Sequence, residues 1–96
     1  MNERIREEID DINSEALSLD GLDGDKFAFD DAIIGIAERC GMDSVLAYDE
    51  DKIIDILMEK YDMDGSEAQE WYSYNMVGAY VGEGTPIFVK MSSNIL

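Results

Sequence analysis

Apolar residues recur with a helical period in the first part of the chain. Ile5, Ile9, Ile12 and Ala16 follow spacings of four, three and four residues, which places them on one stripe of a helix. The charged residues between them lie off this stripe and are expected to face water. The pattern predicts an acidic amphipathic helix over residues 2–17, which the glycines and aspartates of "SLDGLDGDK" then end.

A second helix is predicted after this glycine-containing segment. Its apolar stripe has helical spacing and consists of Ile33, Ile36, Ala37 and Cys40. Asp30 precedes the stripe as a candidate N-cap, and Gly41 follows it as a candidate C′ residue. Because Cys40 belongs to the stripe, we expect it to be a small buried hydrophobic residue rather than a reactive thiol.

Two short segments have the composition of β-strands. Residues 44–49, "SVLAYD", are partly β-branched and aromatic, and residues 86–91, "PIFVKM", follow a turn. Pro86 suits the first position of a strand, because no ladder hydrogen bond is lost there. Between the strands, Asp49 is expected to cap a third helix. The buried face of that helix is predicted to carry Ile54, Leu57, Met58 and Tyr61.

A fourth helix is predicted from a capping signal. Asp64 and Glu67 have the spacing of a capping box, with aspartate in place of the usual serine or threonine. The helix is expected to end near Gly82. Its predicted buried stripe consists of Ala68, Trp71, Tyr72, Asn75, Met76 and Ala79. Together these elements predict a single α+β domain over residues 1–96, with about four helices packed against a small two-stranded sheet.

Two glycines and one amide stand out inside the predicted helices. Gly35 and Gly78 each cost ~1 kcal/mol relative to alanine in a helix interior. We expect them to let the second and fourth helices approach closely, so that Gly35→Leu would unfold the protein. The amide of Asn75 is expected to hydrogen-bond a neighbouring turn, with a ligand contact as the alternative.

The segment "VGEGTP" raises the question of a phosphate-binding loop. A P-loop requires a Lys and then a Ser or Thr after its last glycine, leading into a helix; here no Lys directly follows Gly84, and Pro86 leads into a strand. We therefore expect a turn with positive φ at Gly82 and Gly84. The alternative is a recognition loop that presents Glu83 and Thr85.

Charge narrows the classes of function. The net charge is −16 with seven Lys and Arg residues, which opposes direct binding of nucleic acid and of anionic membranes. No apolar stretch is long enough to span a membrane. The N-terminus is charged where a signal peptide would be apolar, and the single cysteine cannot form an internal disulfide. These features predict a cytoplasmic protein.

The residues offer little for catalysis or metal binding. The chain has no histidine, so ordinary Ser-His-Asp and Cys-His sites cannot form, and we expect neither an enzyme nor a cofactor. An EF-hand register that starts at Asp62 puts Glu67 at the required glycine, and one that starts at Asp23 puts Ala28 there. No metal site is predicted. Weak cation association by "LDGLDGDKFAFDD" is the alternative.

The residues support three classes of binding function. The leading one is an acidic face that binds another protein, in its sharpest form as a DNA mimic for a nucleic-acid-binding enzyme. The alternative is that the acids confer solubility and have no role in binding. The candidate acidic face consists of Glu3, Glu7, Asp10, Asp11, Asp20, Asp23, Asp25, Asp30, Asp49, Asp51 and Asp55.

The second class is an adaptor or homodimer that uses an aromatic patch. This patch would consist of Trp71, Tyr74, Met76 and Tyr80, with Tyr74 exposed. A strand or the C-terminal tail covering these residues is the alternative. The third class is a small-ligand or cation-binding domain. Its site would combine Asn75 with the turn formed by Gly82, Glu83, Gly84, Thr85 and Pro86.

Four stretches of the chain resemble a known group of proteins. They are "FDDAIIG", "YDEDKIIDILM", "DMDGSEA" and "NMVGAYVGEGTPIF". Together they are similar to short uncharacterised proteins encoded by bacteriophages and prophages. The resemblance implies a phage-type accessory protein that acts inside a bacterial cell, and it brings no established activity. Our leading hypothesis is that the protein binds and modulates or inhibits a host protein, in an anti-defence or anti-restriction role if it mimics DNA. The resemblance divides the chain into an acidic N-terminal helix at 1–18, a family-like core at 27–90 and a tail at 91–96.

Overall fold

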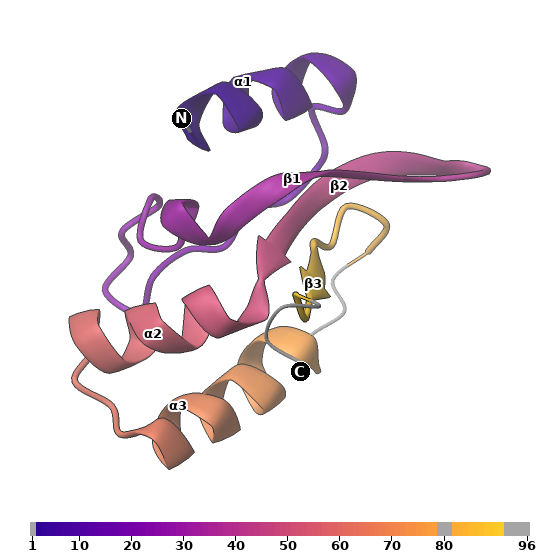
Figure 1. Cartoon of the computed structure of the whole chain (residues 1–96). Coiled ribbons are helices and arrows are strands. Elements are labelled where there is room, and N and C mark those ends of the chain that lie inside the picture. The colour runs from indigo at the N-terminus through magenta and orange to yellow at the C-terminus, as the bar shows by residue number, and fades with distance from the viewer. Residues whose placement is uncertain (1, 79–81, 92–96) are drawn as a thin grey trace.

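The computed structural model describes residues 2–78 and 82–91. Within these residues the chain forms an α+β domain with three α-helices and a three-stranded sheet (Figure 1). The elements in chain order are α1 (Asn2–Ile12), the 3-10 helix η1 (Asp30–Ala32), β1 (Ile33–Arg39), β2 (Met42–Asp49), α2 (Glu50–Lys60), α3 (Gly65–Tyr72), the π-helix η2 (Ser73–Val77) and β3 (Ile87–Val89).

The sheet is mixed and has the strand order β1-β2-β3. β1 and β2 form an antiparallel hairpin in which Ile33 lies opposite Tyr48. β3 pairs with β2 in parallel, with Ile87 opposite Ala47, and the chain between these two strands contains α2 and α3. The predicted strands at 44–49 and 86–91 are therefore confirmed, and the sheet gains a strand that was expected to be a helix.

The prediction of a helix over Ile33 to Cys40 is wrong, because this segment forms β1 and the hairpin turn. An apolar run this short fits the periods of helices and strands alike, and its isoleucines favour an extended backbone. Gly41 has φ +79° in the turn instead of ending a helix. Cys40 occupies the same turn and is exposed rather than buried.

The N-terminal helix is shorter than predicted. α1 ends at Ile12, whose side chain is 52% exposed, while Ile9 is buried as expected. Beyond the helix, the Asn13 amide Nδ2 donates a hydrogen bond to the Ser44 carbonyl oxygen at 2.9 Å. The Asn13 Oδ1 atom also accepts a hydrogen bond from the Glu15 N–H at 3.2 Å, and such a local side-chain bond competes with helix continuation. The bond to Ser44 joins the end of α1 to β2.

The N-terminal signals of α2 and α3 are confirmed. The Asp49 carboxylate accepts from the backbone N–H groups of Asp51 and Lys52, at 3.0 and 3.4 Å. Asp64 and Glu67 form the reciprocal capping box at the start of α3. These bonds satisfy amide groups that have no partner inside the helix.

The buried face of α2 is displaced from the predicted one. Ile53 and Leu57 are fully buried, Ile54 and Tyr61 are half-buried, and Met58 is exposed. Of the four residues predicted for the buried face of α2, Leu57 alone is fully buried. After α3 the helical path widens into η2, and Gly78 follows as its last described residue. Ala79 and the expected helix end before Gly82 lie outside the described residues.

The core lies between the helices and the sheet. Figure 1 shows the strands between α1 and the α2–α3 pair. The ring of Phe88 on β3 packs edge-on against the Tyr72 ring, with 5.4 Å between centroids. No helix among the described residues combines the length and apolar character needed to cross a membrane. The largest fully buried side chains are Tyr48, Phe29, Leu46, Ile53 and Leu57, with Tyr72 beside them.

The expectation that Gly35 and Gly78 allow two helices to approach is wrong. Gly35 lies in β1, and a Cβ atom added there would meet no atom within 4 Å. At Gly78 an added Cβ would lie 3.2 Å from the Ser73 carbonyl oxygen of its own helix. Two other glycines have close tertiary neighbours: an added Cβ would overlap the Tyr61 hydroxyl at Gly21 and would lie 2.5 Å from the Glu15 carbonyl oxygen at Gly84.

Candidate functional site

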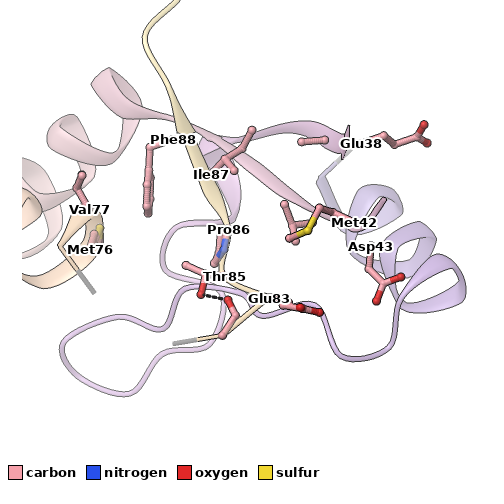
Figure 2. A pocket seen from close by; sticks show the side chains of 13 residues that line it. Glu38, Met42, Asp43, Met76, Val77, Glu83, Thr85, Pro86, Ile87 and Phe88 are labelled. Atoms are coloured by element: carbon pink, nitrogen blue, oxygen red, sulfur yellow. Dashed lines mark hydrogen bonds between the residues drawn. The ribbon is translucent and has the colours of Figure 1, made fainter. Parts of the chain in front are cut away.

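A cavity of about 410 Å³ opens where the end of the β1–β2 hairpin meets η2, the glycine turn and β3 (Figure 2). We call it the hairpin groove. Its walls come from segments that are distant in sequence, namely residues within 37–45 on one side and residues within 76–77 and 82–88 on the other. Antiparallel pairing of β1 with β2 and parallel pairing of β3 with β2 bring these walls together.

One end of the hairpin groove is apolar. Figure 2 shows Met76, Val77 and Phe88 together at this end. Met76 is buried, Phe88 is half-buried, and Val77 is 56% exposed at the margin. The Phe88 ring is held by its edge-on contact with Tyr72, so the apolar end rests on the core of the domain.

The other end of the hairpin groove is acidic. Glu38, Asp43 and Glu83 lie around Met42 in Figure 2, and all three acidic side chains are exposed. The described residues that line the groove include no lysine or arginine. Because like charges are concentrated beside a low-dielectric wall, the site favours a cationic ligand over an anionic one.

The glycine turn is confirmed as a turn, and it forms part of the groove. Gly82 has φ +114°, as expected, whereas Gly84 does not share this conformation. The Thr85 hydroxyl Oγ1 donates to the Gly82 carbonyl oxygen at 2.6 Å and closes the turn. Leu17 N–H donates to the Gly84 carbonyl oxygen at 2.9 Å, which ties the turn to the segment after α1. Glycine is needed at position 84 for this close approach and not for its φ.

Asn75 does not belong to the groove. Its side chain is exposed, and Nδ2 donates to the Trp71 carbonyl oxygen at 3.0 Å, one turn earlier in the same helical path. The amide therefore bonds its own helix, not the neighbouring turn that we expected. The structure separates Asn75 from the residues of the glycine turn, although Gly82, Glu83, Thr85 and Pro86 all line the groove.

The expected aromatic patch is not a continuous exposed surface. Tyr74 is 77% exposed, as predicted, but Trp71 is half-buried against the core and Met76 is buried. Tyr80 lies outside the described residues. Val77, which sequence reasoning omitted, is the exposed apolar neighbour of Tyr74 in η2.

Several residues of the expected acidic face have structural roles instead. Asp30 is buried, and both of its carboxylate oxygens accept from Arg6 Nε, at 2.8 and 2.7 Å, so its placement on an interaction face is wrong. Asp25 pairs with Lys60 at 3.2 Å. Asp23 accepts from the Tyr61 hydroxyl at 2.8 Å, and this hydrogen bond lowers the pKa of the Asp23 carboxyl.

The remaining acids of that face are divided between two surfaces. Figure 1 shows the strands between α1 and α2, so the acids of these two helices do not share one surface. The side chain of Glu3 lies outside the described side chains. The exposed members of the expected face in these helices and in the intervening loop are Glu7, Asp10, Asp11, Asp20, Asp23, Asp51 and Asp55.

Sequence reasoning missed the acids Glu38 and Asp43 of the groove. Glu38 was assigned to a helix that ended before Asp43, so the two carboxylates were not expected to lie across a hairpin turn. The available signal was Gly41 between two β-branched segments, a pattern typical of a hairpin. That pattern would have placed both acids beside the turn.

The described parts of the chain contain no cluster of three His, Cys, Asp or Glu side chains arranged to hold a metal ion. Comparison of the chain with protein-family models, with curated proteins and with solved structures returned no match. The arrangement itself therefore carries the functional argument: an apolar cleft with carboxylates at one end, on a strongly acidic domain.

Proposed function

We propose that this protein is a non-enzymatic interaction module that binds a basic region of another protein. The observation that carries the proposal is which carboxylates pair with the lysine and arginine side chains. Three ion pairs form among the described residues, and each neutralises a carboxylate that is at least partly covered: Asp30, Asp25 and Glu50. Their side chains are 12%, 37% and 12% exposed. The most exposed carboxylates do not take part in these three pairs, so their charge is available to an external partner.

The setting that we propose is a bacterial host cell infected by a phage. The support is the resemblance of four stretches to phage and prophage proteins, of which "NMVGAYVGEGTPIF" is the most specific. The described residues of that stretch at 76–77 and 82–88 supply one wall of the hairpin groove. The proposed role is therefore an accessory protein that binds and modulates, or inhibits, a host protein.

DNA mimicry is the narrower form of this proposal. α1 is ~16 Å long and carries Glu7, Asp10 and Asp11 exposed along it. Duplex DNA carries one charge per ~1.7 Å of axis. α1 alone would therefore occupy only a short stretch of a partner's cleft that binds duplex DNA. If the partner is a nucleic-acid-binding enzyme, duplex DNA should compete with this protein for it.

A pull-down from nuclease-treated bacterial lysate tests the proposal. The bait is the whole protein, the column is eluted with a NaCl gradient, and a triple variant Glu7→Gln, Asp10→Asn, Asp11→Asn is run in parallel. We expect a basic partner that elutes at moderate salt, since exposed charges are screened beyond ~10 Å at 0.1 M. Retention that is unaffected by salt would contradict charge-driven binding.

An adaptor or homodimer that acts through Tyr74 is the second candidate. The observation that favours it is the exposure of Tyr74 beside Val77. The substitution Tyr74→Glu separates the two candidates, because it should abolish an aromatic contact and leave a partner held by charge in place. Sedimentation of the wild type and of this variant shows whether the contact is with a second copy.

A further inference from the structure

We infer that the hairpin groove binds a segment of the partner protein in which a large apolar side chain lies next to a lysine or arginine. This inference rests on the proposed function, and it names the site and the chemistry of the segment. The groove joins an apolar end at Met76, Val77 and Phe88 to an acidic end at Glu38, Asp43 and Glu83.

The size and lining of the groove fit a side chain with its flanking backbone. A volume of about 410 Å³ falls within the range of ~300–1,000 Å³ in which proteins hold compact ligands. Val77 and Ile87 are exposed beside buried Met76 and Pro86, so an apolar side chain placed there would cover apolar surface. Burial of apolar area is the main favourable term in such contacts.

The charge of the groove decides between possible occupants. A second copy of this chain has a net charge of −16 and would bring further acids toward Glu38, Asp43 and Glu83. Like charges that face each other across an interface disfavour association. A lysine or arginine of another protein would instead meet three carboxylates at the end of the groove while its apolar neighbour fills the other end.

The groove is also held in shape before a ligand arrives. The Gly82–Thr85 hydrogen bond and the Leu17–Gly84 hydrogen bond fix the glycine turn, and Tyr72 supports Phe88. A site whose loops and side chains are already ordered loses less binding free energy to their ordering when the ligand binds. Together the fixed apolar end and the exposed carboxylates predict selectivity for segments that combine both kinds of side chain.

Cys40 offers a local reporter for the test. It is exposed in the turn between Glu38 and Met42, two lining residues of the groove, and the chain has no other cysteine. We would attach an environment-sensitive fluorophore to Cys40 and titrate a capped nine-residue peptide of alternating lysine and leucine. Matched peptides replace every leucine by serine or every lysine by glutamate. A Cys40→Ser, Ser66→Cys protein labelled on α3 reports binding remote from the groove.

Two matched triple variants separate the groove from general acidity. Glu38→Gln, Asp43→Asn, Glu83→Gln removes the acidic end, and Glu59→Gln, Asp62→Asn, Glu70→Gln removes the same charge at exposed residues outside both the groove and the expected acidic face. We expect the groove variant to raise the peptide Kd about tenfold, since three exposed ion pairs are lost, and the control variant to raise it less than twofold. Val77→Ser should weaken binding of the leucine peptide, whereas Ile12→Ser, at an exposed residue of α1, should not.

Each outcome has a defined meaning. Equal weakening by both triple variants would overturn the groove and leave the proposed function intact, because binding would then follow net charge alone. Failure of the leucine peptide to bind, while lysate still yields a salt-sensitive basic partner, would also overturn the groove alone. A dimer that Val77→Ser dissociates and Tyr74→Glu leaves intact would overturn the partner segment and assign the groove to a second copy. Circular dichroism of every variant checks that the fold is retained.

Discussion

Arg6 on α1 and Asp30 in η1 form a hydrogen-bonded ion pair, with 2.7 Å between Nε and Oδ2. Arg6 also donates through Nη2 to the Lys26 carbonyl oxygen at 2.6 Å, and its guanidinium lies 5.0 Å from the centre of the Phe27 ring. One cation thus joins the N-terminal helix to the segment before β1. In a chain with 23 acids, this pair uses one of seven cations inside the fold.

We expect Arg6→Ala to lower the free energy of unfolding by about 2 kcal/mol, because it takes a charged hydrogen-bond donor away from a covered carboxylate. Urea unfolding at pH 7 measures the change. Arg4→Ala is the matched control, since Arg4 lies on the same helix and is exposed. Equal effects of the two substitutions would show that the ion pair adds nothing specific.

The two glycines with contrasting surroundings make a paired test. Gly84→Ala should destabilise the fold by about 1–3 kcal/mol, because its Cβ would overlap the Glu15 carbonyl oxygen. Gly35→Ala should leave stability unchanged or raise it slightly, since open space surrounds that position in β1. Thermal unfolding compares the two. A larger loss at Gly35 would restore the close-packing role that the structure does not support.

Stability should fall at alkaline pH because of a buried tyrosine. Burial raises the pKa of the Tyr48 hydroxyl to about 12, above the usual value of about 10. The unfolded chain loses this proton first, so the contribution is fully present below pH 10 and is lost as pH rises toward 12. The expected slope is about 1.4 kcal/mol per pH unit.

Tyr48→Phe is the control for the alkaline slope. It keeps the ring but removes the titrating hydroxyl, together with the hydrogen bond that this hydroxyl accepts from Leu19 N–H at 3.0 Å. Urea unfolding of both proteins between pH 9 and pH 11.5 measures the slopes. An unchanged slope in the variant would assign the pH dependence to other groups, such as Tyr72, whose pKa is raised by burial and by the Glu50 carboxylate.

Added salt should stabilise the fold. Exposed acids outnumber the cations, so screening reduces self-repulsion in the native state. We expect the melting temperature to rise as NaCl increases from about 10 mM to about 300 mM, over which the Debye length shortens strongly. A falling melting temperature would mean that ion pairs such as Lys60–Asp25 outweigh the repulsion.

The features that sequence reasoning predicted correctly are mostly local. The Asp49 cap and the Asp64–Glu67 capping box depend on hydrogen bonds between residues that lie within three positions of each other. Pattern and chemistry agree at these sites, so the starts of α2 and α3 follow from the residues. The glycine turn was predicted for the same reason, because Gly82 supplies a positive φ that few residues adopt.

The features that it missed depend on pairings that the apolar spacing alone does not show. Ile33 to Arg39 is a strand because it pairs with β2 across the hairpin turn, whereas its apolar spacing fits a helix equally well. Asp30 was predicted to be a helix N-cap, and it instead forms an ion pair with Arg6, 24 residues away in the sequence. The groove was missed because of the first of these errors, since Glu38 and Asp43 line the same cavity as Glu83 only when residues 33–39 form the hairpin with β2.

The parallel pairing of β3 with β2 has a consequence for the order of assembly. The β1–β2 hairpin closes through the short turn at Cys40 and Gly41, whereas β3 reaches β2 after a connection that contains α2 and α3. Loop closure costs more entropy for the longer connection. The hairpin and β3 form opposite walls of one cleft. A chain in which β3 has not yet paired with β2 therefore has no cleft, and the capacity to bind is acquired when this last pairing forms.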